Sequence, residues 1–121
     1  MSPHIDKPSL IYKIVNAEAW TAAAASGLFE GAPVDRQDGY IHFSTAAQVR
    51  ETAAKHFAGV EGLVLAAFDP EALGAKLVWE PSRGGALFPH LYAKLETALA
   101  VWVKALPLDG AGGHVFPGDL T

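Results

Sequence analysis

Hydrophobic and polar residues alternate most clearly over residues 39–45, Gly-Tyr-Ile-His-Phe-Ser-Thr. Successive side chains of a strand point to opposite faces, so Ile41 and Phe43 are predicted to face the core. The opposite face then carries a phenol, an imidazole and a hydroxyl, contributed by Tyr40, His42 and Ser44. The pattern predicts a short strand that leads directly into a helix, with polar groups near the helix N-terminus, where unpaired N–H groups favour anions.

Two helices are predicted in the N-terminal half of the chain. The first covers residues 17–26, with Asn16 as its N-cap and Gly27 as its stop. The second runs from Thr45 to about Phe57, because Thr45 and Gln48 have the spacing of a capping box. The polar residues 31–39 between the two helices are predicted to form a loop.

The remaining hydrophobic runs predict strands. The run over residues 63–68 has no polar face and is predicted to be a central strand buried on both sides. Lys13 is the single charge in the run over residues 10–15. It indicates either an edge strand with its lysine in solvent or a lysine that lines a site. The other predicted strands cover residues 76–80 and 88–92. Residues 95–106 can form a helix or a strand, and Val-Trp-Val at 101–103 with the following Pro107 favours a strand.

Together these elements predict one α+β domain, with two early helices packed on a mostly antiparallel sheet. The length of 121 residues suits a single domain. We place its core at about residues 9–108 and expect a glycine-rich, flexible tail over residues 109–121.

Charge and composition exclude several functional classes. A net charge of −4 argues against a broad surface for duplex nucleic acid. The chain has no cysteine, which rules out disulfides and thiolate chemistry. Because it shows neither a signal-peptide run near its first residues nor a membrane-length apolar segment, we expect a cytoplasmic protein that does not contact membranes.

Two predicted strands each place a histidine and a tyrosine on one face, Tyr40 with His42 and His90 with Tyr92. Histidine suits proton transfer or phosphate binding near neutral pH, and tyrosine can stack on a ring. Arg83, next to two glycines, could bind a phosphate bidentately. We therefore expect a cleft that holds a small ligand.

Two alternatives to a ligand-binding cleft remain open. The strand histidines and tyrosines can be ordinary structural residues. A metal site is the second alternative, because His42, His90 and Glu80 would make a set of two histidines and one carboxylate. Their spacings do not form a local ligand signature, so no metal is predicted.

Four stretches resemble the motifs of a small bacterial family of unknown function that is similar in fold to ADP-ribosyltransferases and RNA 2′-phosphotransferases. They are Ile-Tyr-Lys-Ile at residues 11–14, Asp-Gly-Tyr-Ile-His-Phe-Ser-Thr at 38–45, Val-Trp-Glu at 78–80 and Phe-Pro-His-Leu-Tyr at 88–92. The resemblance covers roughly residues 9–108. It implies a split, strongly bent sheet around a cleft for NAD, ADP-ribose or a 2′-phosphorylated nucleotide.

The resemblance also implies roles for the site residues. His42 and His90, with Glu80, would carry the chemistry, and Lys13, Tyr40, Ser44, Arg83 and Tyr92 would bind the ligand. NAD would be a substrate rather than a tightly bound cofactor. The sequence departs from the family pattern at Lys13, where a histidine is usual, and lacks a clear match for the late glutamate of the transferases. A binding or regulatory module without catalysis is the alternative.

Overall fold

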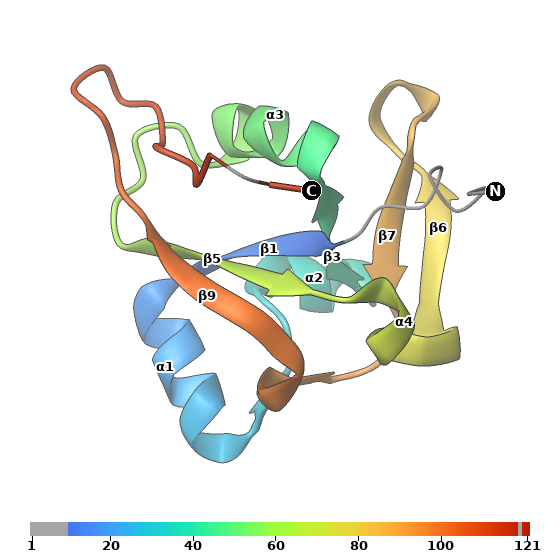
Figure 1. Cartoon of the computed structure of the whole chain (residues 1–121). Coiled ribbons are helices and arrows are strands. Elements are labelled where there is room, and N and C mark those ends of the chain that lie inside the picture. The colour runs from blue at the N-terminus through green and yellow to red at the C-terminus, as the bar shows by residue number, and fades with distance from the viewer. Residues whose placement is uncertain (1–9, 119) are drawn as a thin grey trace, which may run out of the picture.

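The computed structural model describes residues 10–118 and 120–121, and it describes Arg83 without its side chain (Figure 1). The helices are α1 (Ala17–Ser26), α2 (Pro33–Asp38), α3 (Ala46–His56) and α4 (Pro70–Leu73). The strands are β1 (Ile11–Asn16), β2 (Leu28–Phe29), β3 (Ile41–His42), β4 (Ser44–Thr45), β5 (Leu63–Phe68), β6 (Leu77–Pro81), β7 (Leu87–Leu91), β8 (Leu95–Glu96) and β9 (Ala100–Leu106).

All strand pairs are antiparallel, which confirms the mixed α+β class. The largest sheet has the order β4-β1-β5-β9, so β5 is central, as predicted. A second sheet has the order β3-β7-β6, and β2 pairs with β8. Figure 1 shows the β6–β7 hairpin standing beside the four-stranded sheet.

Alternation along β1 divides the core into two clusters. Ile11 and Val15 pack in the cluster that contains Trp20 of α1, whereas Tyr12 and Ile14 pack in the cluster that contains Val49 of α3. The two long helices therefore cover opposite faces of the four-stranded sheet, α3 above and α1 below in Figure 1. Both faces of the four-stranded sheet are therefore buried under a helix.

Local sequence signals explain where the two long helices begin and end. The Asn16 side chain accepts a hydrogen bond from the Ala19 N–H at 3.0 Å, and Gly27 takes a left-handed conformation with φ of 94°. At α3, the Gln48 side chain accepts a hydrogen bond from the Thr45 N–H at 3.0 Å. Gln48 also donates to the Leu87 carbonyl at 2.8 Å, which ties α3 to β7.

Three sequence predictions are wrong in detail. Residues 33–38 form a short helix, α2, within the expected loop, with Pro33 in its first turn. Residues 41–45 form two strands, β3 and β4, in different sheets rather than one strand. Of the two alternatives for Lys13, the edge strand is wrong, because β1 is paired on both sides by β4 and β5, and the side chain of Lys13 is only 7% exposed.

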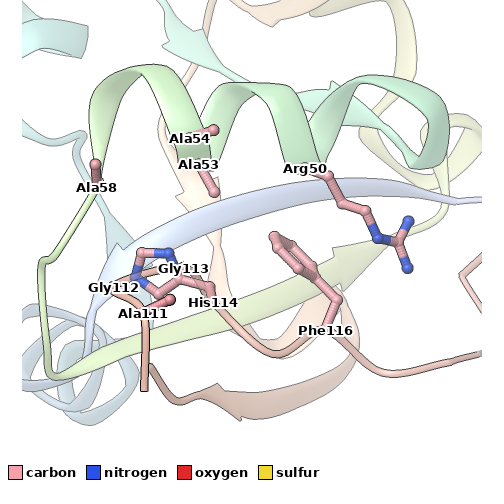
Figure 2. Close-up of a pocket in the computed structure, with 9 residues that line it drawn as sticks. All are labelled: Arg50, Ala53, Ala54, Ala58, Ala111, Gly112, Gly113, His114 and Phe116. Atoms are coloured by element: carbon pink, nitrogen blue, oxygen red, sulfur yellow. The ribbon is translucent and has the colours of Figure 1, made fainter. Parts of the chain in front are cut away.

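The residues after β9, for which we expected a flexible tail, lie beside α3. Phe116 packs against the cluster of Val49, and the Arg50 guanidinium lies 5.2 Å from the Phe116 ring centroid. The His114 Nε2 lies 2.9 Å from the Val60 carbonyl oxygen. A cavity of about 360 Å³ between this segment and α3 is called the C-terminal cavity below (Figure 2).

Candidate functional site

The chain changes sheets between β3 and β4, and this change positions the candidate site. Ile41 and His42 pair with β7, whereas Ser44 pairs with Tyr12 of β1. The Phe43 N–H between them donates to the Pro89 carbonyl at 3.0 Å. The side chain of His42 is thereby fixed at the junction of the two sheets.

His42 lies directly opposite His90 across the β3–β7 pair. The two ring centroids are 5.5 Å apart, and the planes are close to perpendicular. Both histidines line a cavity of about 640 Å³, called the main cavity below. The expectation that one small ligand can contact both rings therefore agrees with the geometry.

Apolar side chains form much of the wall of the main cavity, and polar groups form the rest. The apolar residues include Ile14, Pro33, Val34, Phe43, Phe57 and Phe88. The polar residues include Lys13, Asp38, His42, Ser44 and His90. Its volume falls in the range of roughly 300–1,000 Å³ that is usual for small-molecule sites.

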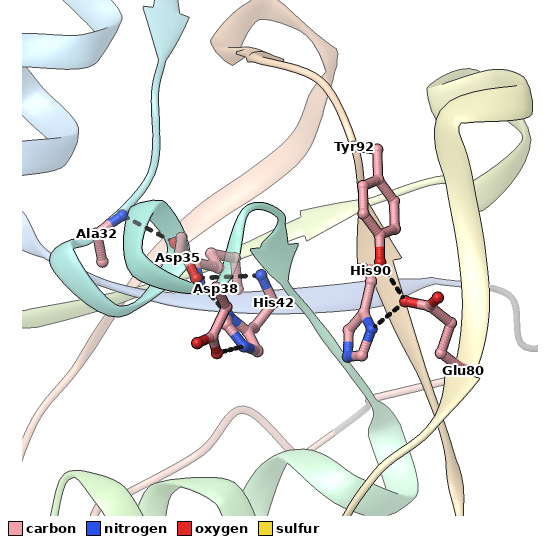
Figure 3. A network of polar contacts seen from close by, with 8 residues as sticks. Ala32, Asp35, Asp38, His42, Glu80, His90 and Tyr92 are labelled. Carbon is pink, nitrogen blue, oxygen red and sulfur yellow. Dashed lines mark hydrogen bonds and ion pairs between the residues drawn. The ribbon is translucent and has the colours of Figure 1, made fainter.

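Asp35 is a buried carboxylate, 1% exposed, that organises the His42 side of the cavity (Figure 3). Its oxygens lie 3.0 and 3.1 Å from Lys13 Nζ, and Oδ1 lies 2.6 Å from His42 Nδ1. Backbone N–H groups of Ala32 and His42 also donate to it, at 2.8 and 3.1 Å. One side chain of α2 therefore connects β1 and β3.

Burial and charge act in opposite directions on the ion pair of Asp35 and Lys13. For Asp35, burial alone would raise the pKa, but the hydrogen bond from His42, the charge of Lys13 and the N–H of Ala32 together lower it to about 2. Burial lowers the pKa of Lys13, although Asp35 opposes this effect. We take Asp35 as ionised, because four donors surround its oxygens.

The second nitrogen of the His42 ring faces a different carboxylate. Nε2 lies 2.9 Å from Asp38 Oδ2, at the C-terminal end of α2. Figure 3 shows the ring between Asp35 and Asp38. Both nitrogens can donate to these carboxylates only when the ring carries two protons.

His90 is held by a different carboxylate, on the neighbouring strand β6. Its Nδ1 lies 2.7 Å from Glu80 Oε1, and the Tyr92 hydroxyl donates to the same oxygen at 2.8 Å (Figure 3). These hydrogen bonds, that from His90 first, lower the pKa of Glu80, and Glu80 in turn raises the pKa of Tyr92. When Nδ1 of His90 carries the proton that is donated to Glu80, Nε2 of the neutral ring is an acceptor.

Tyr40 joins the two histidine clusters. Its ring stacks on His90 with centroids 4.0 Å apart and an angle of 25°, and its centroid is 4.6 Å from that of His42. Burial, followed by the charges of Asp38 and Glu80, raises its pKa. The His-Tyr pairs predicted from the two strands therefore form one aromatic cluster.

The chain matches a family model described as a protein of unknown function (DUF952) over residues 14–103. The chain belongs to the DUF952 family. The crystal structure of protein CC0527 from Caulobacter crescentus is 50% identical and covers 88% of this chain and 93% of its own, with a TM-score of 0.85. The solution NMR structure of CC0527 is also 50% identical and covers 87% and 90%, with a TM-score of 0.79. No curated protein matches the sequence.

The other predicted site residues of this DUF952 protein occupy different positions. Ser44 lines the main cavity, and its hydroxyl lies 3.0 Å from that of Thr52. Tyr40, Glu80 and Tyr92 are not among the residues that line the cavity. Tyr40 and Glu80 contact the histidines, whereas Tyr92 contacts Glu80 and Tyr40. The side chain of Arg83 lies outside the described part of the structure, so its predicted phosphate contact stays a prediction.

Sequence reasoning missed the roles of Asp35 and Asp38 in this DUF952 site. Both lie in the residues expected to form a loop. The signal that could have identified Asp35 is Pro33 two residues before it, because proline at the first helical position and an acidic residue in the first turn are typical of a helix start.

Two further observations concern metal binding and membrane-spanning helices. Within residues 10–118 and 120–121, no group of three or more His, Cys, Asp or Glu side chains is arranged to hold a metal ion, including His42, His90 and Glu80. In the same part of the chain, no helix has the length and hydropathy needed to cross a membrane.

Proposed function

We propose that the main cavity binds a nucleotide-like ligand, such as NAD, ADP-ribose or a 2′-phosphorylated nucleotide, and that His90 exchanges a proton with it. The observation that carries the proposal is the pairing of His42 with His90 on one cavity, with each ring oriented by its own carboxylate. A histidine held at Nδ1 by a carboxylate presents Nε2 for acid–base chemistry.

The walls of the main cavity fit both parts of such a ligand. The aromatic and aliphatic side chains of Val34, Phe43 and Phe88 would contact a base or a nicotinamide ring. His42 would face the phosphates, since an imidazolium donates charge-assisted hydrogen bonds to phosphate oxygens. We also propose that the fold is of the ADP-ribosyltransferase type and that the reaction is a group transfer.

Glu80 has a positioning role in this proposal. Cleavage of a nicotinamide–ribose bond passes through an oxocarbenium-like state that a carboxylate stabilises, much as in glycoside hydrolysis. Glu80 Oε1 already accepts hydrogen bonds from His90 and Tyr92. We therefore assign Glu80 to the orientation of His90 rather than to direct contact with the ribose.

A binding module without catalysis is the second candidate, and one observation favours it. Lys13 and His42, two basic residues of the cavity wall, are already paired: Lys13 with Asp35, and His42 with Asp35 and Asp38. Such pairing reduces the charge available to stabilise a transition state. A turnover assay separates the two candidates: an enzyme would release nicotinamide from NAD or transfer a phosphate, whereas a module would bind ADP-ribose without consuming NAD.

The binding step is tested by calorimetric titration of NAD, ADP-ribose and adenosine into the wild type and His42→Ala. We expect saturable binding of at least one phosphate-bearing compound to the wild type, weakened in His42→Ala and weaker for adenosine. The absence of heat for all three compounds at high protein concentration would contradict the nucleotide proposal.

A further inference from the structure

We propose that Asp38 holds the position on His42 Nε2 that an anionic group of the ligand would take, and that it competes with that group. The inference rests on the proposed function and adds to it a specificity-determining residue. It assigns the anionic subsite of the main cavity to one atom, His42 Nε2, and makes Asp38 the residue that sets how tightly anions bind there.

The two carboxylates on the His42 ring are held very differently. Asp35 is 1% exposed and accepts four hydrogen bonds, including those from Lys13 and from the backbone of Ala32. The Asp38 side chain is 39% exposed. Within the described residues, His42 is the partner found for the Asp38 carboxylate. Asp35 is thus a fixed support for the ring, and Asp38 is a replaceable contact.

The buried ion pairs of Asp35 are also more costly to break than the partly exposed ion pair between Asp38 and His42. Breaking a buried ion pair leaves an uncompensated charge and is strongly unfavourable. A partly exposed pair contributes little, because solvent screens it and the side chain gains freedom on release. Asp38 also gains no support from its helix, since it lies at the C-terminal end of α2, where a carboxylate is unfavourable.

Charge balance explains why an anion would replace Asp38. When His42 carries two protons, Lys13, His42 and Asp35 together have a net positive charge, because two cations face one carboxylate. Asp38 neutralises that charge at the cavity wall, which both His42 and Asp38 line. A phosphate oxygen at Nε2 would supply the same negative charge from the ligand.

The test compares the wild type with Asp38→Asn and Asp38→Ala. ADP-ribose, inorganic phosphate and adenosine are titrated calorimetrically into each protein. Since the lost competitor is a partly exposed ion pair, we expect ADP-ribose and phosphate to bind roughly fivefold more tightly to both variants. Adenosine, which has no anionic group, should bind as it does to the wild type.

Glu61→Gln is the matched control, because it removes one exposed negative charge outside the cavity walls. A gain of the same size in Glu61→Gln would show a general charge effect and overturn the inference. Unchanged or weaker binding of ADP-ribose to both Asp38 variants would overturn it as well, while wild-type binding keeps the proposed function intact. Absence of binding to every protein would overturn both.

Discussion

The rings of His42 and His90 lie opposite each other on paired strands, with their centroids 5.5 Å apart. Different carboxylates hold the two rings. The His42 ring contacts two carboxylates of α2, whereas the His90 ring contacts Glu80 of β6. Two histidines on one cavity with different carboxylate partners are suited to different tasks, which in the proposed function are anion binding and proton exchange.

The two histidines should differ in their effect on folding. The sequence predicts that both histidines face the cleft, but His90 is only 3% exposed and stacks on Tyr40. His90→Ala should lower the free energy of unfolding by about 1–3 kcal/mol, because it removes a buried hydrogen bond and leaves a gap beside Tyr40. Denaturant melts measure this difference.

His56→Ala serves as the control for His90→Ala, because His56 is exposed on α3. A surface change of this kind should alter the free energy of unfolding by no more than about 0.5 kcal/mol. If His90→Ala melts at the same denaturant concentration as His56→Ala, then the packing of His90 does not contribute to stability as the structure indicates.

Asp35 should dominate the stability of the protein in acid. Its pKa is lowered to about 2 in the folded state, below the ordinary value of 3.8. Its contribution is therefore fully present above about pH 4 and is lost as the pH falls through about 2, and it amounts to roughly 2 kcal/mol. Denaturant melts of the wild type across this range should show the loss.

Asp35→Asn should differ from the wild type both in its stability at neutral pH and in its response to acid. At neutral pH it should be less stable by about 3–5 kcal/mol, because Lys13 loses its buried ionic partner. Between about pH 4 and 2 its free energy of unfolding should change less than that of the wild type, since the titrating group is gone. An equally steep loss in the variant would show that other carboxylates govern the acid response.

Strong local patterns explain the correct sequence predictions. The hydrophobic runs of β1 and β5 and the alternation along β7 predicted these strands within a residue or two of their bounds. The spacing of His90 and Tyr92 on one strand predicted their shared face, and both contact Glu80 in the structure. Such features depend on neighbours along the chain, which the sequence displays directly.

The errors involve residues whose positions depend on distant partners. The edge strand, one of the two alternatives for Lys13, is wrong because the lysine is buried against Asp35, which lies 22 residues further along the chain. The helix α2 has the sequence Pro-Val-Asp-Arg-Gln-Asp, in which no apolar periodicity exists. A six-residue helix that is stabilised by the contacts of Asp35 cannot be detected from periodicity alone.

Glu80 should control the ionisation of the tyrosines on its side of the site. Its hydrogen bond raises the pKa of Tyr92, and its charge is among the influences that raise the pKa of Tyr40. Glu80→Gln should therefore lower the pH at which tyrosinate absorbance appears, since the neutral amide no longer opposes ionisation. Ultraviolet titration measures the change, with circular dichroism as a check that the protein remains folded.

Tyr92→Phe assigns the transition in that titration. The variant should lack the Tyr92 part of the tyrosinate signal that moves between the wild type and Glu80→Gln, and any movement that remains belongs to Tyr40. If Glu80→Gln titrates as the wild type does, the hydrogen bond between Glu80 and Tyr92 is not formed in solution.

An NMR titration with ADP-ribose, followed through the histidine ring resonances, tests whether one ligand in the main cavity contacts both His42 and His90. His42→Ala and His90→Gln assign the two signals, and His114, which lines the C-terminal cavity, serves as an internal reference. We expect the His42 and His90 signals to shift together with one dissociation constant, while His114 does not move. Shifts of His114 alone, or no shift of any histidine at saturating ADP-ribose, would contradict this expectation.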